Sequence, residues 1–296
     1  MRILFLITII LFNSCYGYSK TRYITTIHPF KEILAEIVGN RGEVHQILPP
    51  GASPHTYELR PSDIKKVETA TALILGGENL DEWARKFQNP NRIELIELLP
   101  EDYLLHIFTD NNKENLTAEK KIDHHYHSGV DPHFWTDPIT VKALVPILAA
   151  KLSEIDNEGK EIYRVNSTKF IAHLDSLYST INQALEPDHG NTVMLSHPFF
   201  RYFLNRFGLK LVGLIEPIPG REPTPKEIKN MVELVKKEKV KAIFTHPQLA
   251  DRAAKLVAEA SGIKVFQLDP IGGVKGRETY DELLLYNLKI LLEALR

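Results

Sequence analysis

The chain has 296 residues, of which 43% are apolar, and a formal net charge of -2. This length and apolar content permit two domains of ordinary size, each with its own hydrophobic core. A net charge near zero supplies no basic field for nucleic acid, so nucleic-acid binding is excluded as the main function.

The first residues have the features of an export signal. A positively charged start is followed by an apolar run over residues 3–12, which is too short to span a bilayer. Cys15, the only cysteine, follows this run and resembles the lipidated cysteine of bacterial lipoproteins; ordinary cleavage near Gly17 is the alternative. We therefore expect residues 1–20 to be a signal and the mature protein to be exported, either periplasmic or membrane-anchored through Cys15. A single cysteine also excludes an internal disulfide.

From residue 21 onward, short apolar segments alternate with amphipathic ones. In the first half the pattern predicts strands over residues 23–27, 43–48, 72–75 and 93–98, and helices over residues 29–38, 62–70 and 138–155. Such a strand–helix–strand series indicates a parallel sheet with helices on both faces.

One helical pattern without proline covers residues 158–185, a length of roughly 40 Å at 1.5 Å per residue. After it, the pattern predicts strands over residues 192–195, 209–215, 240–244 and 263–268, and helices over residues 198–207, 225–238, 247–261 and 278–296. We therefore predict an α/β protein with two lobes of parallel sheets covered by helices. The N-terminal lobe is expected over residues 21–156, a rigid linking helix over 157–187, and the C-terminal lobe over 188–296.

Histidines gather before the helix that starts at Pro138. Three of them lie in the loop 123–127 among Gly, Ser, Asp and Lys, so we expect a solvated loop that helps to capture metal without forming the main site. His133 differs, because it follows a proline and precedes an aromatic pair that packing should hold. His55 has the same setting in a loop with three prolines. Neutral imidazole is a zinc ligand near neutral pH, so these two residues are metal-ligand candidates.

Polar residues also follow the predicted strands of the second half, namely His197, His246 and Asp269. The carboxyl ends of parallel strands line the ligand crevice, so these residues are candidates by position. Together, His55, His133, His197 and Asp269 would give three imidazoles and a carboxylate. That set suits tetrahedral Zn2+, with manganese as the second choice. By spacing alone the signal is weak, since a single histidine is more often a surface or capping residue.

Four motifs occur in order along the chain: PGASPHTYE at residues 50–58, DPHFW at 131–135, SHPF at 196–199 and QLDP at 267–270. They resemble the motifs of the solute-binding proteins of bacterial zinc and manganese ABC transporters, and the resemblance runs from about residue 21 to the C-terminus.

The resemblance implies two α/β lobes joined by one long helix, with the metal between the lobes. It implies His55, His133 and His197 as imidazole ligands and Asp269 as the carboxylate ligand. Manganese-type relatives usually carry glutamate where His197 stands, so imidazole there favours zinc. His246 is a departure, because relatives often have glutamate at that position.

The implied function is capture of zinc outside the cytoplasm and its delivery to the membrane permease subunits of an ABC transporter, by a monomer that is not an enzyme. His28 and His246 repeat the strand–His–Pro–helix junction of His197, so spacing cannot decide which of the three points at metal. We expect His28 and His246 to be structural or to lie outside the direct ligand set.

Two other classes of function remain open at this point. A secreted zinc hydrolase would use three histidines and an open coordination position, but no glutamate stands beside a ligand as an evident general base. A surface adhesin would need no metal at all.

Overall fold

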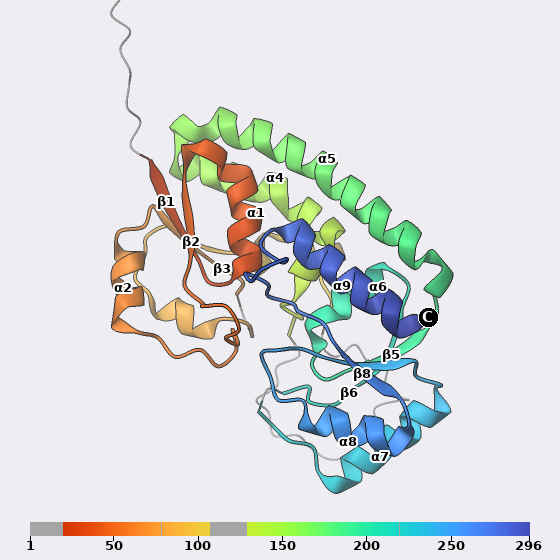
Figure 1. The fold of residues 1–296 in the computed structure, drawn as a ribbon. Coiled ribbons are helices and arrows are strands. Elements are labelled where there is room, and N and C mark those ends of the chain that lie inside the picture. The colour runs from red at the N-terminus through yellow and green to blue at the C-terminus, as the bar shows by residue number, and fades with distance from the viewer. Residues whose placement is uncertain (1–19, 78, 107–128, 219) are drawn as a thin grey trace, which may run out of the picture.

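The computed structural model describes residues 20–77, 79–106, 129–218 and 220–296 (Figure 1). Two four-stranded sheets, one in each half of the chain, form the centres of two lobes. The first lobe precedes the long helix α5 (Lys160–Leu185) and the second lobe follows it. The predicted α/β architecture of two lobes joined by one long helix is thereby confirmed.

The strands of the first sheet are parallel and lie in the order β2-β1-β3-β4. The strands are β1 (Thr21–Thr25), β2 (Gly42–Gln46), β3 (Ala72–Leu75) and β4 (Arg92–Glu94), and the helices of this lobe are α1 (His28–Val38), α2 (Pro61–Glu68), α3 (Leu95–Leu98) and α4 (Pro138–Ile155). All four residues of β3 are buried. This is typical of a parallel strand covered on both faces, and it explains the uninterrupted apolar run.

The second sheet repeats this topology with the order β6-β5-β7-β8, again all parallel. The strands are β5 (Thr192–Leu195), β6 (Lys210–Leu214), β7 (Ala242–Thr245) and β8 (Lys264–Gln267), and the helices are α6 (Arg201–Arg206), α7 (Pro225–Lys237), α8 (Arg252–Ser261) and α9 (Tyr280–Leu295). Helices α7 and α9 are each preceded by a capping threonine, Thr224 and Thr279. The threonine hydroxyl accepts a hydrogen bond from the backbone N–H of the glutamate three residues later, and the side chain of that glutamate accepts one from the threonine backbone N–H.

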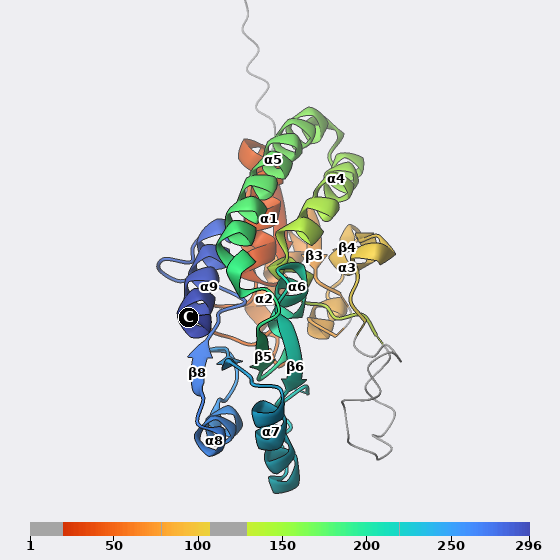
Figure 2. The ribbon, with the colours of Figure 1, turned by 90° about the vertical axis from the view of Figure 1, so that its right-hand side faces the viewer.

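Helix α5 is 26 residues long, about 39 Å at 1.5 Å per residue, and it runs along both lobes (Figure 1 and Figure 2). It packs against α4 and α1 of the first lobe and against α9 of the second. Its buried stripe consists of Tyr163, Ser167, Phe170, Leu174, Leu177, Ile181 and Leu185. Because this stripe contacts both lobes, α5 fixes one lobe relative to the other.

A buried polar network fastens the start of α5 to the first lobe. The Arg41 guanidinium donates from Nε and Nη2 to the two oxygens of Asp156, both at 2.6 Å. Tyr163 donates its hydroxyl to Asp156 at 2.6 Å, and its oxygen lies 2.8 Å from the hydroxyl of Tyr23 on β1. The hydrogen bonds from Arg41 lower the pKa of Asp156. The network therefore joins β1, the turn before α5 and α5 itself.

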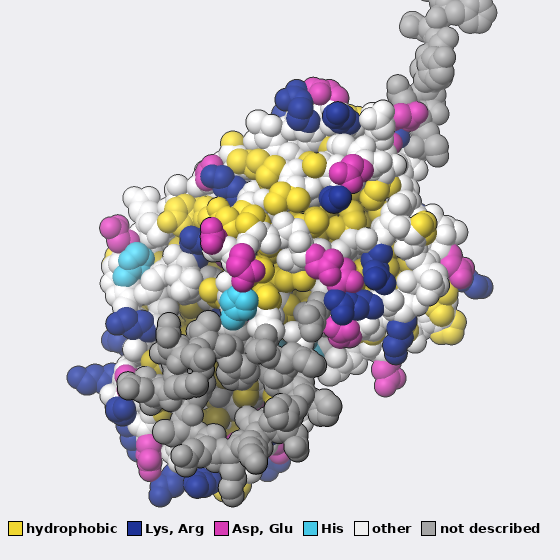
Figure 3. All heavy atoms as spheres, turned by 180° about the vertical axis from the view of Figure 1, so that it is seen from behind, with side chains coloured by type: hydrophobic (Ala, Val, Ile, Leu, Met, Phe, Trp, Pro, Cys, Tyr) yellow, Lys and Arg dark blue, Asp and Glu magenta, His cyan; other side chains and the backbone are white. Residues whose placement is uncertain are grey.

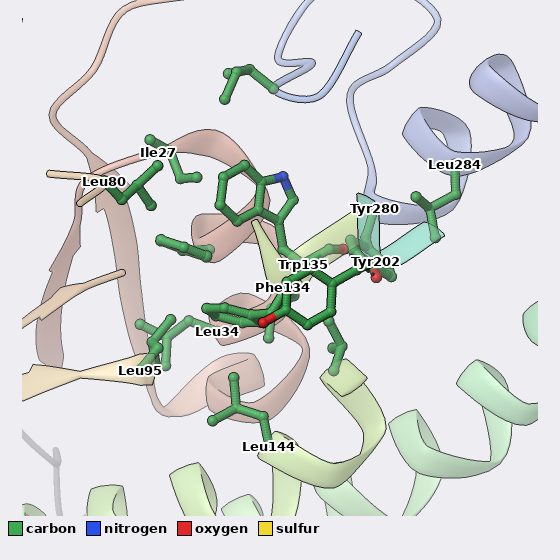
Figure 4. Close-up of a cluster of buried hydrophobic side chains, with 14 of the residues drawn as sticks. Ile27, Leu34, Leu80, Leu95, Phe134, Trp135, Leu144, Tyr202, Tyr280 and Leu284 are labelled. Carbon is green, nitrogen blue, oxygen red and sulfur yellow. Dashed lines mark hydrogen bonds between the residues drawn. The ribbon is translucent and has the colours of Figure 1, made fainter. Parts of the chain in front are cut away.

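One cluster of buried hydrophobic side chains contains residues of both lobes (Figure 4). Trp135, which is fully buried, donates its indole N–H to the Pro270 carbonyl at 2.8 Å, and Tyr280 of α9 donates to the Trp135 carbonyl at 2.7 Å. Tyr202 of α6 donates to the Asp131 carbonyl at 2.8 Å. The main hydrophobic cluster thus includes residues of both lobes, which ties the lobes together more closely than two separate cores would.

Two predicted elements are wrong in part. The apolar segment 93–98 was expected to be a strand, but only Arg92–Glu94 pairs with β3 and the chain then turns into the short helix α3. Short apolar runs fit either structure, so periodicity could not separate them. The helix expected over residues 247–261 begins at Arg252, because the chain first makes a turn at Pro247 and Gln248 and is irregular up to residue 251.

On the face shown in Figure 3, basic and acidic side chains are interspersed, and neither sign dominates a large area of the visible surface. None of the helices in the described part of the chain is long and apolar enough to cross a membrane.

Candidate metal centre

His55 lies in the proline-rich loop between β2 and α2. The indole N–H of Trp83 donates to the Pro54 carbonyl at 2.7 Å, and the Tyr57 ring packs at a tilt against Trp83 with ring centroids 4.9 Å apart. The Tyr57 hydroxyl in turn donates to Asp63 on α2 at 2.9 Å. These contacts hold the loop on both sides of His55 and so fix its direction.

His133 is buried and is oriented by Asp131. Its Nδ1 lies 2.7 Å from Asp131 Oδ1, and its backbone N–H donates to the same oxygen at 3.1 Å. Arg201 of α6 donates to the other oxygen at 3.0 Å. Burial raises the pKa of Asp131, but His133 and Arg201 outweigh this effect and lower it, so the carboxylate stays ionised. Since the carboxylate only accepts, the proton of a neutral His133 stands on Nδ1 and Nε2 keeps its lone pair.

His197 follows β5 at the carboxyl edge of the second sheet and is 3% exposed. Its Nδ1 lies 3.2 Å from the Glu216 carbonyl oxygen, which can only accept, so Nδ1 donates and Nε2 is again the bare nitrogen.

The Nε2 atoms of these three histidines converge. His55 Nε2 lies 3.2 Å from His133 Nε2 and 3.3 Å from His197 Nε2, and the three ligand atoms lie within 4.8 Å of one another. A tetrahedral zinc ion with Zn–N bonds of about 2.0–2.1 Å places neighbouring nitrogens about 3.3 Å apart. One proton on His55 cannot satisfy two facing lone pairs, so this arrangement fits a cation at its centre.

The ring of Phe199, two residues after His197, packs among these imidazoles. Its centroid lies 5.5 Å from that of His55, 4.4 Å from that of His133 and 4.8 Å from that of His197. The buried phenyl ring therefore limits how the imidazoles rotate and keeps the site apolar on one side.

The surroundings hold the imidazoles of His55 and His197 neutral. Burial lowers the pKa of His55 to about 3, helped by His133, and it lowers the pKa of His197 well below its usual value. A ligand nitrogen must be unprotonated to coordinate, so these two histidines are already in the protonation state that metal binding requires.

Asp269 does not join the three nitrogens. Its Oδ2 accepts from Arg277 at 2.8 Å, and its Oδ1 accepts from the backbone of Ile271 and Gly272 and from Gln248 at 3.0–3.1 Å. Its role as a ligand stays a prediction.

The two histidines at similar junctions differ in their partners. Both nitrogens of buried His28 are engaged, at 2.8 Å from Gln46 Oε1 and 2.9 Å from the Glu278 carbonyl. His246 is also buried, yet neither of its nitrogens makes a hydrogen bond to a described residue. The loop 123–127 lies outside the described residues.

Asp131, Phe199 and Arg201 were not among the residues predicted for the site. The spacing of Asp131 and His133 was a usable signal, because a carboxylate two residues before a histidine can reach its Nδ1. The position of Arg201 on α6 could not be inferred, since it depends on how the lobes meet.

We expect acid to destabilise the metal-free protein through its buried imidazoles, and His246 serves as the test case. Burial, with His133, lowers the pKa of His246 to about 3, against an ordinary value near 6.5 in the unfolded chain. Between these values the unfolded state binds the extra proton, so stability is full above pH 6.5 and falls as the pH drops toward 3. One such residue should cost about 2 kcal/mol between pH 7 and pH 5.

Urea unfolding of metal-free wild type and His246→Gln at pH 7 and pH 5 checks this. The variant should lose less stability on acidification, and equal losses in both proteins would refute the assignment.

Fold and site together define a two-lobed solute-binding protein for a metal ion. The ZnuA family model, described as "Zinc-uptake complex component A periplasmic", matches residues 24–294, and the chain belongs to this family.

Individual proteins agree with this. A putative metal-binding protein of Thermotoga maritima is 31% identical over 98% of both chains. Zinc-binding protein AdcA of Streptococcus pyogenes is 27% identical over 88% of this chain, which spans only 52% of that relative. The crystal structure of a zinc-bound AdcAII variant of Streptococcus pneumoniae, 27% identical, superposes with a TM-score of 0.78 over 94% of this chain and 99% of that one.

Proposed function

We propose that the protein captures zinc outside the cytoplasm and delivers it to the permease of an ABC transporter. The observation that carries the proposal is the convergence of three Nε2 atoms within 4.8 Å of one another. His55 Nε2 lies at tetrahedral edge lengths from those of His133 and His197. Two of the ligands come from the first lobe and one from the second, so the ion would sit between the lobes.

The fourth coordination position has two candidates in this chain. The sequence predicts Asp269, and the structure adds His246, whose nitrogens are buried and without partners.

Zinc is expected to be preferred over manganese. Three neutral nitrogens form the preorganised part of the site, and manganese is better suited by carboxylate, carbonyl and water oxygens. Metal-stripped protein should therefore take up close to one equivalent of zinc from an equimolar zinc and manganese mixture. Elemental analysis after desalting measures the outcome, and manganese in excess would reverse the assignment.

The hydrolase and adhesin alternatives gain no specific support from the site. The relatives above are described as metal-binding or zinc-binding proteins, which favours a carrier. We infer that the bound metal is cargo, and turnover of ester or peptide substrates by the zinc-loaded protein would contradict this.

We also infer that the protein is exported, with residues 1–20 as the signal, and that it works as a monomer. Cys15 is the proposed lipid attachment site, and mass spectrometry of the mature protein distinguishes a lipidated Cys15 from cleavage near Gly17.

The lobes should move little as whole bodies when metal binds. Helix α5 packs on both lobes, and the Trp135 indole and the Tyr280 hydroxyl make hydrogen bonds across the junction. Loops at the facing edges are then the parts that respond. Small-angle scattering of metal-free and metal-loaded protein should give nearly equal radii of gyration, and a large decrease on loading would rule out a stiff connection.

A further inference from the structure

We propose that His246 is the fourth metal ligand of this protein, completing a site of four imidazoles, while Asp269 stays paired with Arg277. This inference rests on the proposed function. It assigns a coordinating role to a residue that the sequence left as structural or outside the direct ligand set.

The first observation is that the ring nitrogens of His246 are buried and have no hydrogen-bond partner among the described residues. It follows β7, the strand beside β5, so it stands at the same carboxyl edge as His197. It is 3% exposed, and within the described part of the chain neither ring nitrogen makes a hydrogen bond. Buried polar atoms without partners are uncommon because they lose their hydration without compensation. His28, at the equivalent junction after β1, has partners for both nitrogens.

The second observation is its position beside the other imidazoles. The ring centroid of His246 lies 5.8 Å from that of His197, whereas the three converging histidines have centroids 5.1–5.4 Å apart. The ring centroid of Phe199 lies 4.5 Å from that of His246. Its distances to the centroids of the other three imidazoles are 4.4–5.5 Å. The Phe199 ring thus has four imidazoles around it. His246 is outside the group of nitrogens within 4.8 Å, so coordination requires its ring to move toward them.

The neighbouring segment allows that shift. A turn at Pro247 and Gln248 and a bend at Leu249 follow His246, and α8 begins only at Arg252. On its C-terminal side His246 is held by one long turn hydrogen bond, from Leu249 N–H to its carbonyl at 3.5 Å, and its ring nitrogens have no hydrogen bond to break.

Gln248 provides the group that would orient the fourth imidazole. Its Oε1 is buried and also without a partner, while its amide nitrogen donates to Asp269 at 3.1 Å. A metal-bound histidine usually donates its second ring N–H to such an oxygen. With one His246 nitrogen donating to Gln248 Oε1, the other is free to coordinate. Burial keeps the imidazole neutral, as its lowered pKa indicates.

Asp269 is the less accessible candidate. Its carboxylate accepts four hydrogen bonds, including the ion pair with Arg277 at 2.8 Å. Coordination by Asp269 must displace some of these, whereas coordination by His246 displaces none. A set of four neutral nitrogens also lacks the oxygen ligands that manganese prefers, so His246 would sharpen selection for zinc and similar ions.

X-ray absorption of the zinc-loaded protein tests the proposal, because scattering from imidazole rings reports how many histidines bind the ion. Wild type should give four imidazoles and His246→Gln three. The zinc Kd of His246→Gln should rise about 10- to 100-fold or more, since loss of a group that only orients a ligand already costs that much. His28→Gln, the matched control at the equivalent junction, should keep four imidazoles and the wild-type Kd.

Asp269→Asn completes the design and should change the zinc Kd by less than about threefold. Tight zinc binding by wild type with three imidazoles, unaffected by His246→Gln, would overturn the assignment, and a large loss in Asp269→Asn would give the position to Asp269. Wild type that binds no zinc tightly would instead overturn the proposed function itself. Thermal unfolding of each metal-free variant separates loss of a ligand from loss of the fold.

Discussion

Replacing His55 with alanine should raise the zinc Kd by more than about 100-fold while the protein stays folded. Its Nε2 is the central atom of the group, within 3.3 Å of both His133 Nε2 and His197 Nε2, so its removal opens the site on the first lobe. Removing an orienting neighbour of a ligand already costs about 10- to 100-fold, and removing the ligand should cost more. Isothermal titration with a competing chelator measures the change.

His45→Ala is the matched control. His45 lies on β2 of the same lobe, is exposed, and has Glu43 as its neighbour at 3.3 Å. It should bind zinc as wild type does. If His55→Ala kept the wild-type Kd, the converging nitrogens would not be the binding site.

Replacing Asp156 with alanine should have the largest effect on stability. The change removes two hydrogen bonds to the buried Arg41 guanidinium and the acceptor of the Tyr163 hydroxyl. Deleting one partner of a buried ion pair costs about 3–5 kcal/mol. Arg41 keeps its contact with the Glu158 carboxylate at 3.0 Å, so we expect a loss toward the lower end of this range. Urea unfolding of the metal-free protein should therefore show a midpoint well below that of wild type.

Glu161→Ala provides the comparison on the same helix. Glu161 pairs with Arg164 at 2.6 Å, but both side chains are exposed to water, which screens the pair. This variant should unfold at the same urea midpoint as wild type. Equal losses of stability in the two variants would mean that α5 itself, rather than the buried network, was disturbed.

Much of the fold followed from local patterns. The apolar run of β3 and the long proline-free stripe of α5 predicted a buried parallel strand and a connecting helix, and both are present. The start of α8 was missed because Pro247 can open a helix or a turn equally well. The shared core was missed as well, since the hydrogen bond from Trp135 to Pro270 spans 135 residues and has no local signal.

The site was predictable only as a set of candidates. His28, His197 and His246 stand at the same kind of junction, and what separates them is the number of partners on each ring. His28 has two, from Gln46 and Glu278, His197 has one backbone partner, and His246 has none among the described residues. Those partners come from distant segments, so no spacing rule could have assigned the roles.

The distribution of the imidazoles over both lobes has a consequence for release of the ion. In the proposed site, each lobe alone would offer an incomplete chelate, and the fold would present the two halves at a high effective concentration to each other. Coordination bonds tolerate deviations of only about 0.2 Å. A permease that strained the junction around Trp135 by a fraction of an ångström would therefore break the chelate while α5 stayed intact, and the ion could leave without any wide opening of the molecule.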